Sequence, residues 1–371
     1  MVRQPVPFNV LGKMLTALIS ALLGGYVFKL LHIPIPWLLG PMIAVLIGSN
    51  VTKERYVWPT SIRNIGLIIV GYTIGLSMTG KALHEMGVQL PYMLLMTLLL
   101  MLLCALLAYI VSKVSGINYK TALLGSIPGG LTQMVILAEE TEGINLTIVT
   151  VTQVIRLMMI VISVPLLVFS PLLGNHKAVD STIQPIVTAS ASWGQLMPNI
   201  FVFAAVCIVC ALVGNKIKFP TAYLLGPAFG TAIVQVLGLH GPALPSSLIN
   251  VAQIMIGINV GLMLKPSQLT NKLQTISLAI GSSLLLLIGA YGLSMIFIKL
   301  QSVSKSTALL SLAPGGMDQM GIIAHEINAN LSIVAGYQLF RTFFIFFAVP
   351  PMLRLLFKYT GARKTVPKRQ S

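Results

Sequence analysis

Residues 121–140 read TALLGSIPGGLTQMVILAEE, and residues 307–326, 186 positions later, read TALLSLAPGGMDQMGIIAHE. The two stretches are identical at twelve of twenty positions, and both contain Pro-Gly-Gly inside an apolar run. Two unrelated apolar stretches are not expected to share proline, glycine and glutamine in register. The pair therefore predicts one membrane unit that is used twice in the chain.

Other residues repeat in the same order. Leu38-Leu39-Gly40-Pro41 recurs 186 positions later as Leu224-Leu225-Gly226-Pro227. After a one-residue deletion, an Asn...Gln-x-x-Arg pattern recurs 185 positions later: Asn145, Gln153 and Arg156 return as Asn330, Gln338 and Arg341. We expect four regions: membrane repeat 1 at 1–173, a polar linker at 174–195, membrane repeat 2 at 196–358 and a basic tail at 359–371.

Composition places the chain in the membrane class. It is 56% hydrophobic and 9% charged, whereas an ordinary soluble domain carries about 25% charged residues. Apolar runs near the roughly 20 residues needed to cross a bilayer follow one another along the sequence. We predict an all-α polytopic membrane protein with two homologous repeats of five to six membrane segments each, in contact with membrane lipid.

The formal net charge of +16 comes from basic residues that stand one to three at a time between apolar runs. This distribution is typical of topology signals and gives no nucleic-acid partner. It predicts an inner-membrane protein with cytoplasmic N- and C-termini. Twelve crossings in parallel repeats, or ten crossings in inverted repeats with a re-entrant Pro-Gly-Gly segment, fit the charge distribution equally well.

The paired Pro-Gly-Gly motifs should interrupt their helices, because proline removes a backbone donor and glycine weakens a helix. Non-helical backbone at membrane depth is tolerated where it is buried in protein or lines a cavity, and paired interruptions in two halves indicate a transport site. A structural kink is the alternative. The predicted substrate-binding residues of these segments are Gly129, Gly130, Gln133, Gly315, Gly316 and Gln319.

Asp318 is the one carboxylate placed close to an interruption, and its counterpart in the first repeat is Thr132. An unpaired carboxylate is expensive at membrane depth. Asp318 is therefore either an ion-coupling residue for protons or sodium, or the partner of an arginine in a buried structural pair.

Arg156 and Arg341 each lie eleven residues after the asparagine of their pattern, well inside the last segment of each repeat. Gln153 lies on the same helix face as Arg156, and Gln338 lies on the same helix face as Arg341. A guanidinium suits a carboxylate or phosphate, so these four residues are predicted to bind an anionic substrate. The alternative is a pair of structural arginines that are neutralised by Asp318 or by backbone carbonyls.

The Leu-Leu-Gly-Pro, Pro-Gly-Gly-x-x-Gln-Met and Asn...Gln-x-x-Arg pairs together resemble the AbrB-like duplicated membrane protein family of bacteria. The resemblance covers nearly the whole chain and implies a duplicated inner-membrane protein. Members often carry the labels ammonia monooxygenase or AbrB family transcriptional regulator. An oxygenase needs clustered metal ligands, whereas the five histidines, at 32, 84, 176, 240 and 325, are scattered over different segments.

We therefore expect a secondary transporter of a small, anionic solute, driven by a proton or sodium gradient, with no cofactor, no metal and no catalytic residue. Two alternatives remain: a membrane-embedded sensor that affects gene expression indirectly, and a membrane enzyme. A homo-oligomer is compatible with the sequence, which does not specify substrate, transport direction or coupling ion.

Overall fold

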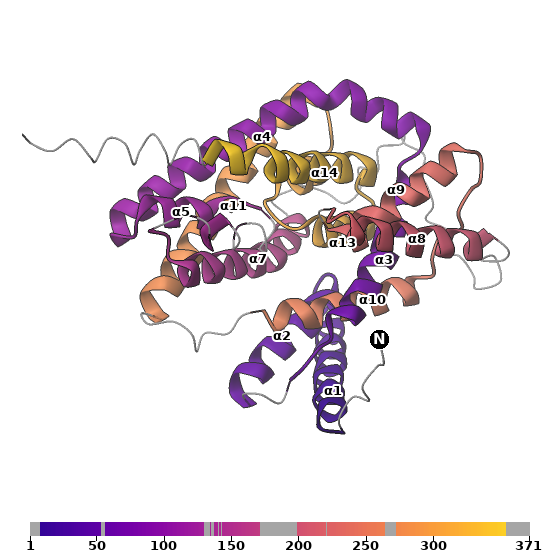
Figure 1. The fold of residues 1–371 in the computed structure, drawn as a ribbon, viewed down its shortest axis with the longest axis horizontal. Coiled ribbons are helices and arrows are strands. Elements are labelled where there is room, and N and C mark those ends of the chain that lie inside the picture. The colour runs from indigo at the N-terminus through magenta and orange to yellow at the C-terminus, as the bar shows by residue number, and fades with distance from the viewer. Residues whose placement is uncertain are drawn as a thin grey trace, which may run out of the picture.

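The computed structural model describes residues 8–52, 56–129, 134, 137–139, 141, 143–170, 199–219, 221–263 and 272–353. Every described element is an α-helix, and the order along the chain is shown in Figure 1. The first sequence repeat contains α1 (Phe8–Leu30), α2 (Pro36–Thr52), α3 (Thr60–Ser77), α4 (Gly80–Ser115), α5 (Tyr119–Ser126) and α7 (Leu146–Val168). The second contains α8 (Asn199–Lys216), α9 (Ala222–Val236), α10 (Ser246–Gly261), α11 (Lys272–Gln301), α12 (Lys305–Leu312), α13 (Met317–Glu326) and α14 (Leu331–Phe347).

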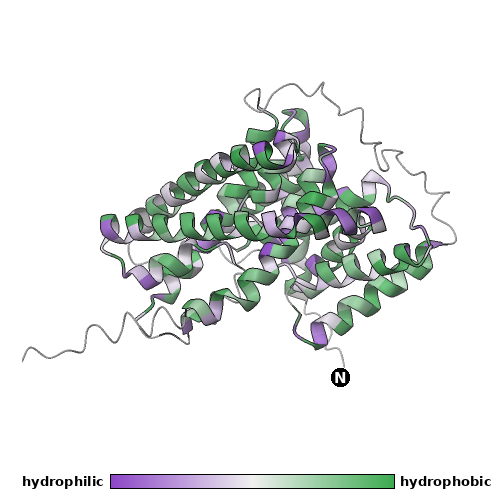
Figure 2. Cartoon of the chain, turned by 90° about the horizontal axis from the view of Figure 1, so that it is seen from above, coloured by the Kyte–Doolittle hydropathy of each residue, from purple (hydrophilic) through white to green (hydrophobic). Residues whose placement is uncertain are grey.

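Five of the described helices are long and apolar enough to cross a membrane: α1, α4, α7, α8 and α11. Four shorter apolar helices, α2, α9, α10 and α14, accompany them. Large apolar side chains are exposed along the long outer helices, for example Leu23 on α1, Leu102 on α4 and Ile288 on α11. Figure 2 shows hydrophobic residues along most of the length of the helices. The predicted all-α chain is confirmed, and it contains helices whose length and composition suit a membrane span.

The helices form two groups, and each group takes equivalent helices from both repeats. The first, the α1–α3/α8–α10 group, is held by α1 on α2, α8 on α9, α3 on α9 and α10 on α2. The second, the α4–α7/α11–α14 group, is held by α4 on α5, α5 on α7, α7 on α11, α11 on α12 and α4 on α14. In Figure 1 the second group occupies the upper left part of the molecule. Contacts of α3 with α13 and α14 join the two groups.

Glycine allows the crossings in the first group. A Cβ atom on Gly71 of α3 would lie 2.3 Å from the carbonyl oxygen of Leu224 on α9. At the equivalent crossing, a Cβ atom on Gly257 of α10 would lie 2.7 Å from the carbonyl oxygen of Leu38 on α2. Small residues permit such close backbone approach between membrane helices. The third helix of each repeat therefore packs on the Leu-Leu-Gly-Pro helix of the other.

Candidate functional site

Both Pro-Gly-Gly stretches separate a short helix from the chain that follows. In the second repeat, α12 ends at Leu312 and α13 begins at Met317, with Ala313–Gly316 non-helical between them. In the first repeat, α5 ends at Ser126, and residues 127–129 are non-helical. Because each short helix stops at its interruption, the last carbonyls of α5 and α12 have no donor from the same helix. Gly130 and Gln133, two of the predicted substrate-binding residues, lie outside the described residues.

Gln153 and Arg156 on α7 supply donors to the end of α5. Nε2 of Gln153 donates to the carbonyl oxygens of Leu124 (2.6 Å) and Ile127 (3.0 Å). Nη1 of Arg156 donates to the carbonyl oxygens of Gly125 (3.2 Å), Ser126 (3.2 Å) and Ile127 (2.8 Å). Nη2 of Arg156 donates to Oε1 of Gln153. Four consecutive carbonyls at the end of the short helix are thus satisfied by one neighbouring helix.

Gln338 and Arg341 on α14 make the equivalent contacts with the end of α12. Nε2 of Gln338 donates to the carbonyl oxygens of Leu310 (2.7 Å) and Ala313 (3.2 Å). Arg341 donates to the carbonyl oxygens of Leu312, Ala313 and Gly315, and also to Oε1 of Gln338. A cation at this end also complements the negative end of the helix dipole. We call each group, Gln153 with Arg156 and Gln338 with Arg341, a Gln–Arg cap.

The asparagine of each Asn...Gln-x-x-Arg pattern has a different role from the glutamine and the arginine. Asn145 and Asn330 lie at the N-terminal ends of α7 and α14, where each side chain accepts from the backbone N–H three residues later. They cap their own helices. The glutamine and arginine of each pattern instead face the interruption.

The two arginines are buried and close to each other. Arg156 is 5% exposed and Arg341 is 4% exposed. Their guanidinium groups are near enough to repel each other electrostatically. Every hydrogen bond described for them goes to a backbone carbonyl or to the glutamine of the same cap. These contacts agree with the alternative in which the two arginines are structural and are neutralised by backbone carbonyls rather than by Asp318.

Each interruption also contacts the last helix of the other repeat. A Cβ atom on Gly129 would lie 3.1 Å from the side chain of Ile345 on α14, and one on Gly315 would lie 3.1 Å from that of Ile160 on α7. Contact with both last helices brings the two interruptions into the interior of the second helix group.

Asp318 and Gln319 lie in the first turn of α13, and neither side chain is hydrogen-bonded to an arginine of the caps in the described part of the chain. Nε2 of Gln319 donates to Oδ2 of Asp318 at 3.0 Å, while Oε1 of Gln319 is buried without a hydrogen-bond partner in the described part of the chain. Arg63 of α3 attracts the Asp318 carboxylate. Gly316 directly precedes this turn, and a Cβ atom there would clash with Oε1 of Gln319 and Oδ1 of Asp318. Asp318 therefore lies where α13 of the second helix group contacts α3 of the first.

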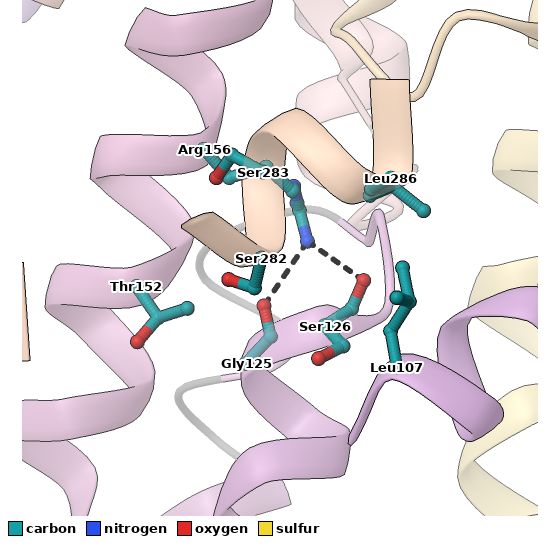
Figure 3. A pocket seen from close by; sticks show the side chains of 8 residues that line it. All are labelled: Leu107, Gly125, Ser126, Thr152, Arg156, Ser282, Ser283 and Leu286. Carbon is teal, nitrogen blue, oxygen red and sulfur yellow. Dashed lines mark hydrogen bonds between the residues drawn. The ribbon is translucent and has the colours of Figure 1, made fainter. Parts of the chain in front are cut away.

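One side of the Arg156 cap opens into a small cavity, shown in Figure 3. The cavity has room for about one water molecule. Its polar lining consists of Arg156 together with four residues from α5, α7 and α11: Ser126, Thr152, Ser282 and Ser283. Nε of Arg156 is buried and has no hydrogen-bond partner among the described residues. The sequence interpretation missed the hydroxyl residues, because single Ser and Thr residues are common in membrane helices. Comparison of the two repeats offers one signal, because the small Thr152 stands where the second repeat has the larger Tyr337.

The described residues contain no cluster of three or more histidine, cysteine, aspartate or glutamate side chains that suits a metal ion. The groups described at the site are a guanidinium, hydroxyl groups and backbone dipoles. Such groups bind and orient a polar solute, and an anion is the natural partner of the guanidinium.

Comparison with known proteins agrees with the family suggested by the motifs. The chain is 26% identical to the uncharacterized protein YhjN of Bacillus subtilis (strain 168) over 358 residues, which cover 92% of each chain. It is 27% identical to the putative regulator AbrB of Escherichia coli (strain K12) over 338 residues, 91% of this chain and 94% of the relative. The family model described as "Transition state regulatory protein AbrB" matches residues 37–357. Since that match spans all but the ends of the chain, the protein belongs to the AbrB family.

Proposed function

We propose that this protein is a secondary carrier that moves a small anionic solute across the inner membrane without converting it chemically. The observation that carries the proposal is the pair of interrupted helices in the interior of an apolar helical protein, with a guanidinium and hydroxyl groups around a cavity at one of them. Irregular backbone at membrane depth is tolerated where it is buried in protein or lines a cavity, and paired interruptions in two halves are typical of transport sites.

The arrangement of helices supports alternating access. Each group is built from both repeats, and α3 supplies main contacts from the first group to α13 and α14 of the second. Rigid-body movement of one helix group against the other would change the access to the interruptions while each group keeps its internal packing. We further propose that both termini face the cytoplasm, as the distribution of basic residues indicates.

Uptake into proteoliposomes tests the proposal. Labelled small carboxylates, amino acids and phosphonates are offered separately under an imposed proton gradient, an imposed sodium gradient, and no gradient. The proposal expects at least one anionic solute to accumulate only under a gradient, with protein-free liposomes as the control. Absence of flux for the whole panel, from protein shown to be folded, would contradict it.

Asp318 is the proposed ion-coupling residue, because its carboxylate lies between an interruption and the contact of α13 with α3. Asp318→Asn keeps the side-chain shape and removes the charge. We expect gradient-driven accumulation to fall at least tenfold while exchange of labelled for unlabelled solute persists. Glu85→Gln, at an exposed position on α4, is the control. Equal accumulation by Asp318→Asn and wild type would exclude Asp318 from coupling.

A sensor is the second candidate, since the matching family description and the E. coli relative both carry the word regulator or regulatory. A sensor would bind its ligand without moving it. Ligand binding in detergent together with absence of flux in proteoliposomes would favour this candidate over the carrier.

A further inference from the structure

Helices α4 and α11, which are equivalent in the two repeats, cross each other at equivalent residues. Leu103 on α4 and Gly289 on α11 are 186 positions apart, which is the offset of the repeat. A Cβ atom on Gly289 would overlap the side chain of Leu103. In a symmetric pair, a position contacts its own equivalent only close to the two-fold axis. A pseudo-two-fold axis that exchanges the two repeats therefore passes close to this crossing.

The contacts on either side of the crossing show that α4 and α11 run in opposite directions. Near the end of α4, Val111 lines the same small space as Thr275 and Leu278 near the beginning of α11. Near the other end of the pair, Met93 of α4 belongs to one hydrophobic cluster with Phe297 of α11. Positions that advance along α4 thus meet positions that go back along α11, so the two equivalent helices are antiparallel.

The direction of the axis follows from this pairing. An axis that exchanges two antiparallel helices lies across them, whereas an axis along the helices would leave them parallel. Both α4 and α11 are long and apolar enough to cross a membrane. An axis across two membrane-crossing helices lies in the plane of the membrane, which is the relation between inverted repeats. The exchanged contacts of Gly71 and Gly257 with the opposite repeat obey the same two-fold symmetry.

Each interrupted segment returns to the level at which it begins. The backbone N–H of Asn145, at the start of α7, donates to Oγ1 of Thr121 near the start of α5 at 3.1 Å. In the second repeat, the backbone N–H of Asn330, at the start of α14, donates to Oγ1 of Thr307 near the start of α12 at 3.2 Å. The chain therefore enters the segment and leaves it on the same side.

The helix lengths in the second repeat suit a hairpin that reaches the middle of a membrane. The entering helix, α12, has 8 residues and the returning helix, α13, has 10. At about 1.5 Å per residue these helices are about 12 and 15 Å long, and a hydrocarbon core is about 30 Å thick. Two such hairpins that enter from opposite faces bring their interruptions close together. The proximity of the equivalent Arg156 and Arg341, which cap the two interruptions, agrees with this meeting point.

We infer that the two repeats are inverted and that each Pro-Gly-Gly segment is a re-entrant hairpin, so that the two hairpins enter the membrane from opposite faces. The crossings among the described helices are then ten: α1–α4, α7, α8–α11 and α14. The hairpin of the first repeat enters from the face that carries both termini. An inverted repeat supplies two equivalent states that open to opposite faces. The use of these states for alternating access rests on the proposed function.

Labelling of single cysteines tests the inference on the full chain in membrane vesicles. The background lacks Cys104, Cys207 and Cys210. The probe positions are exposed and flank the two hairpins: Lys113→Cys and Thr147→Cys in the first repeat, and Lys305→Cys and Asn328→Cys in the second. Ser371→Cys marks the face of the C-terminus. A membrane-impermeant maleimide is added to right-side-out and to inside-out vesicles.

We expect Lys113→Cys and Thr147→Cys to react at least tenfold faster from the face that labels Ser371→Cys. Lys305→Cys and Asn328→Cys should react at least tenfold faster from the other face. Parallel repeats with twelve crossings would instead pair Lys113→Cys with Lys305→Cys and Thr147→Cys with Asn328→Cys. That pattern, or labelling of all four positions from one face, would overturn the inference.

Cross-linking of α4 to α11 gives a second measurement that does not depend on labelling from one face. A short bifunctional thiol reagent should join Val111→Cys to Leu278→Cys, because both positions line the same small space. It should not join Val111→Cys to Ile296→Cys, which lies near the other end of α11. Cross-linking of the second pair and not the first would show parallel helices and overturn the inference.

Failure of this inference and failure of the carrier proposal have different signatures. The expected labelling pattern together with no flux for any solute of the uptake panel keeps the inverted topology and contradicts the carrier. Gradient-driven flux together with the labelling pattern of parallel repeats keeps the carrier and overturns the inverted topology.

Discussion

Arg341→Met lowers the stability of the protein by about 2 kcal/mol or more, because each buried carbonyl that loses its donor costs roughly 1–3 kcal/mol. The carbonyls of Leu312 and Gly315 at the interrupted helix lose the arginine donor, whereas that of Ala313 keeps the bond from Gln338. Methionine fills a similar volume but donates no hydrogen bond. The measurement is thermal unfolding of detergent-solubilised protein, followed by intrinsic fluorescence.

Lys299→Met is the control, since it removes a cation from an exposed position in the last turn of α11. We expect its melting temperature to stay near that of wild type. Equal melting temperatures for Arg341→Met and Lys299→Met would mean that the Gln–Arg cap does not stabilise the interruption. Arg341 would then be available to bind the solute.

Gly71→Ala has the second large effect. The added Cβ would lie 2.3 Å from the carbonyl oxygen of Leu224, far inside the contact distance, so α3 and α9 must separate. Overpacking of this kind typically costs about 1–3 kcal/mol. We therefore expect a clear loss of thermal stability, measured as for Arg341→Met, and a similar loss for Gly257→Ala at the equivalent crossing.

Gly292→Ala is the matched control on α11, where nothing lies within 4 Å of an added Cβ. In a helix, this substitution should stabilise by about 0.5–1 kcal/mol. A Gly71→Ala protein as stable as Gly292→Ala would show that the close helix crossing contributes little to the fold.

The sequence predicted which segments form helices better than it predicted which helices pack against each other. Apolar runs of membrane length predicted the helices, and proline and glycine predicted the interruption between α12 and α13, because these are local effects on backbone hydrogen bonding. The pairing of Gly71 with Leu224 of the other repeat is non-local. Glycine spacing indicates close packing, but it does not name the partner helix.

For the candidate site, the repeated Gln-x-x-Arg pattern identified the buried polar residues but not their contacts. Sequence spacing placed Arg156 deep in its helix, while only the structure shows that the interrupted helix presents its carbonyl end there. The hydroxyl cavity was not predicted, because its lining comes from α5, α7 and α11 together. The sequence predictions for Gly130 and Gln133 lie outside the described residues and stay predictions.

Counterflow distinguishes a carrier that works by alternating access from a protein that only binds its solute. Proteoliposomes are loaded with the unlabelled anionic solute that accumulates in the uptake assay and are diluted into a trace of the same labelled solute with no ion gradient; protein-free liposomes are the control. We expect a transient accumulation of label in the proteoliposomes, because a carrier exchanges solute across the membrane, and none in the protein-free liposomes. A solute that binds the protein but gives no counterflow would contradict alternating access and favour a sensor.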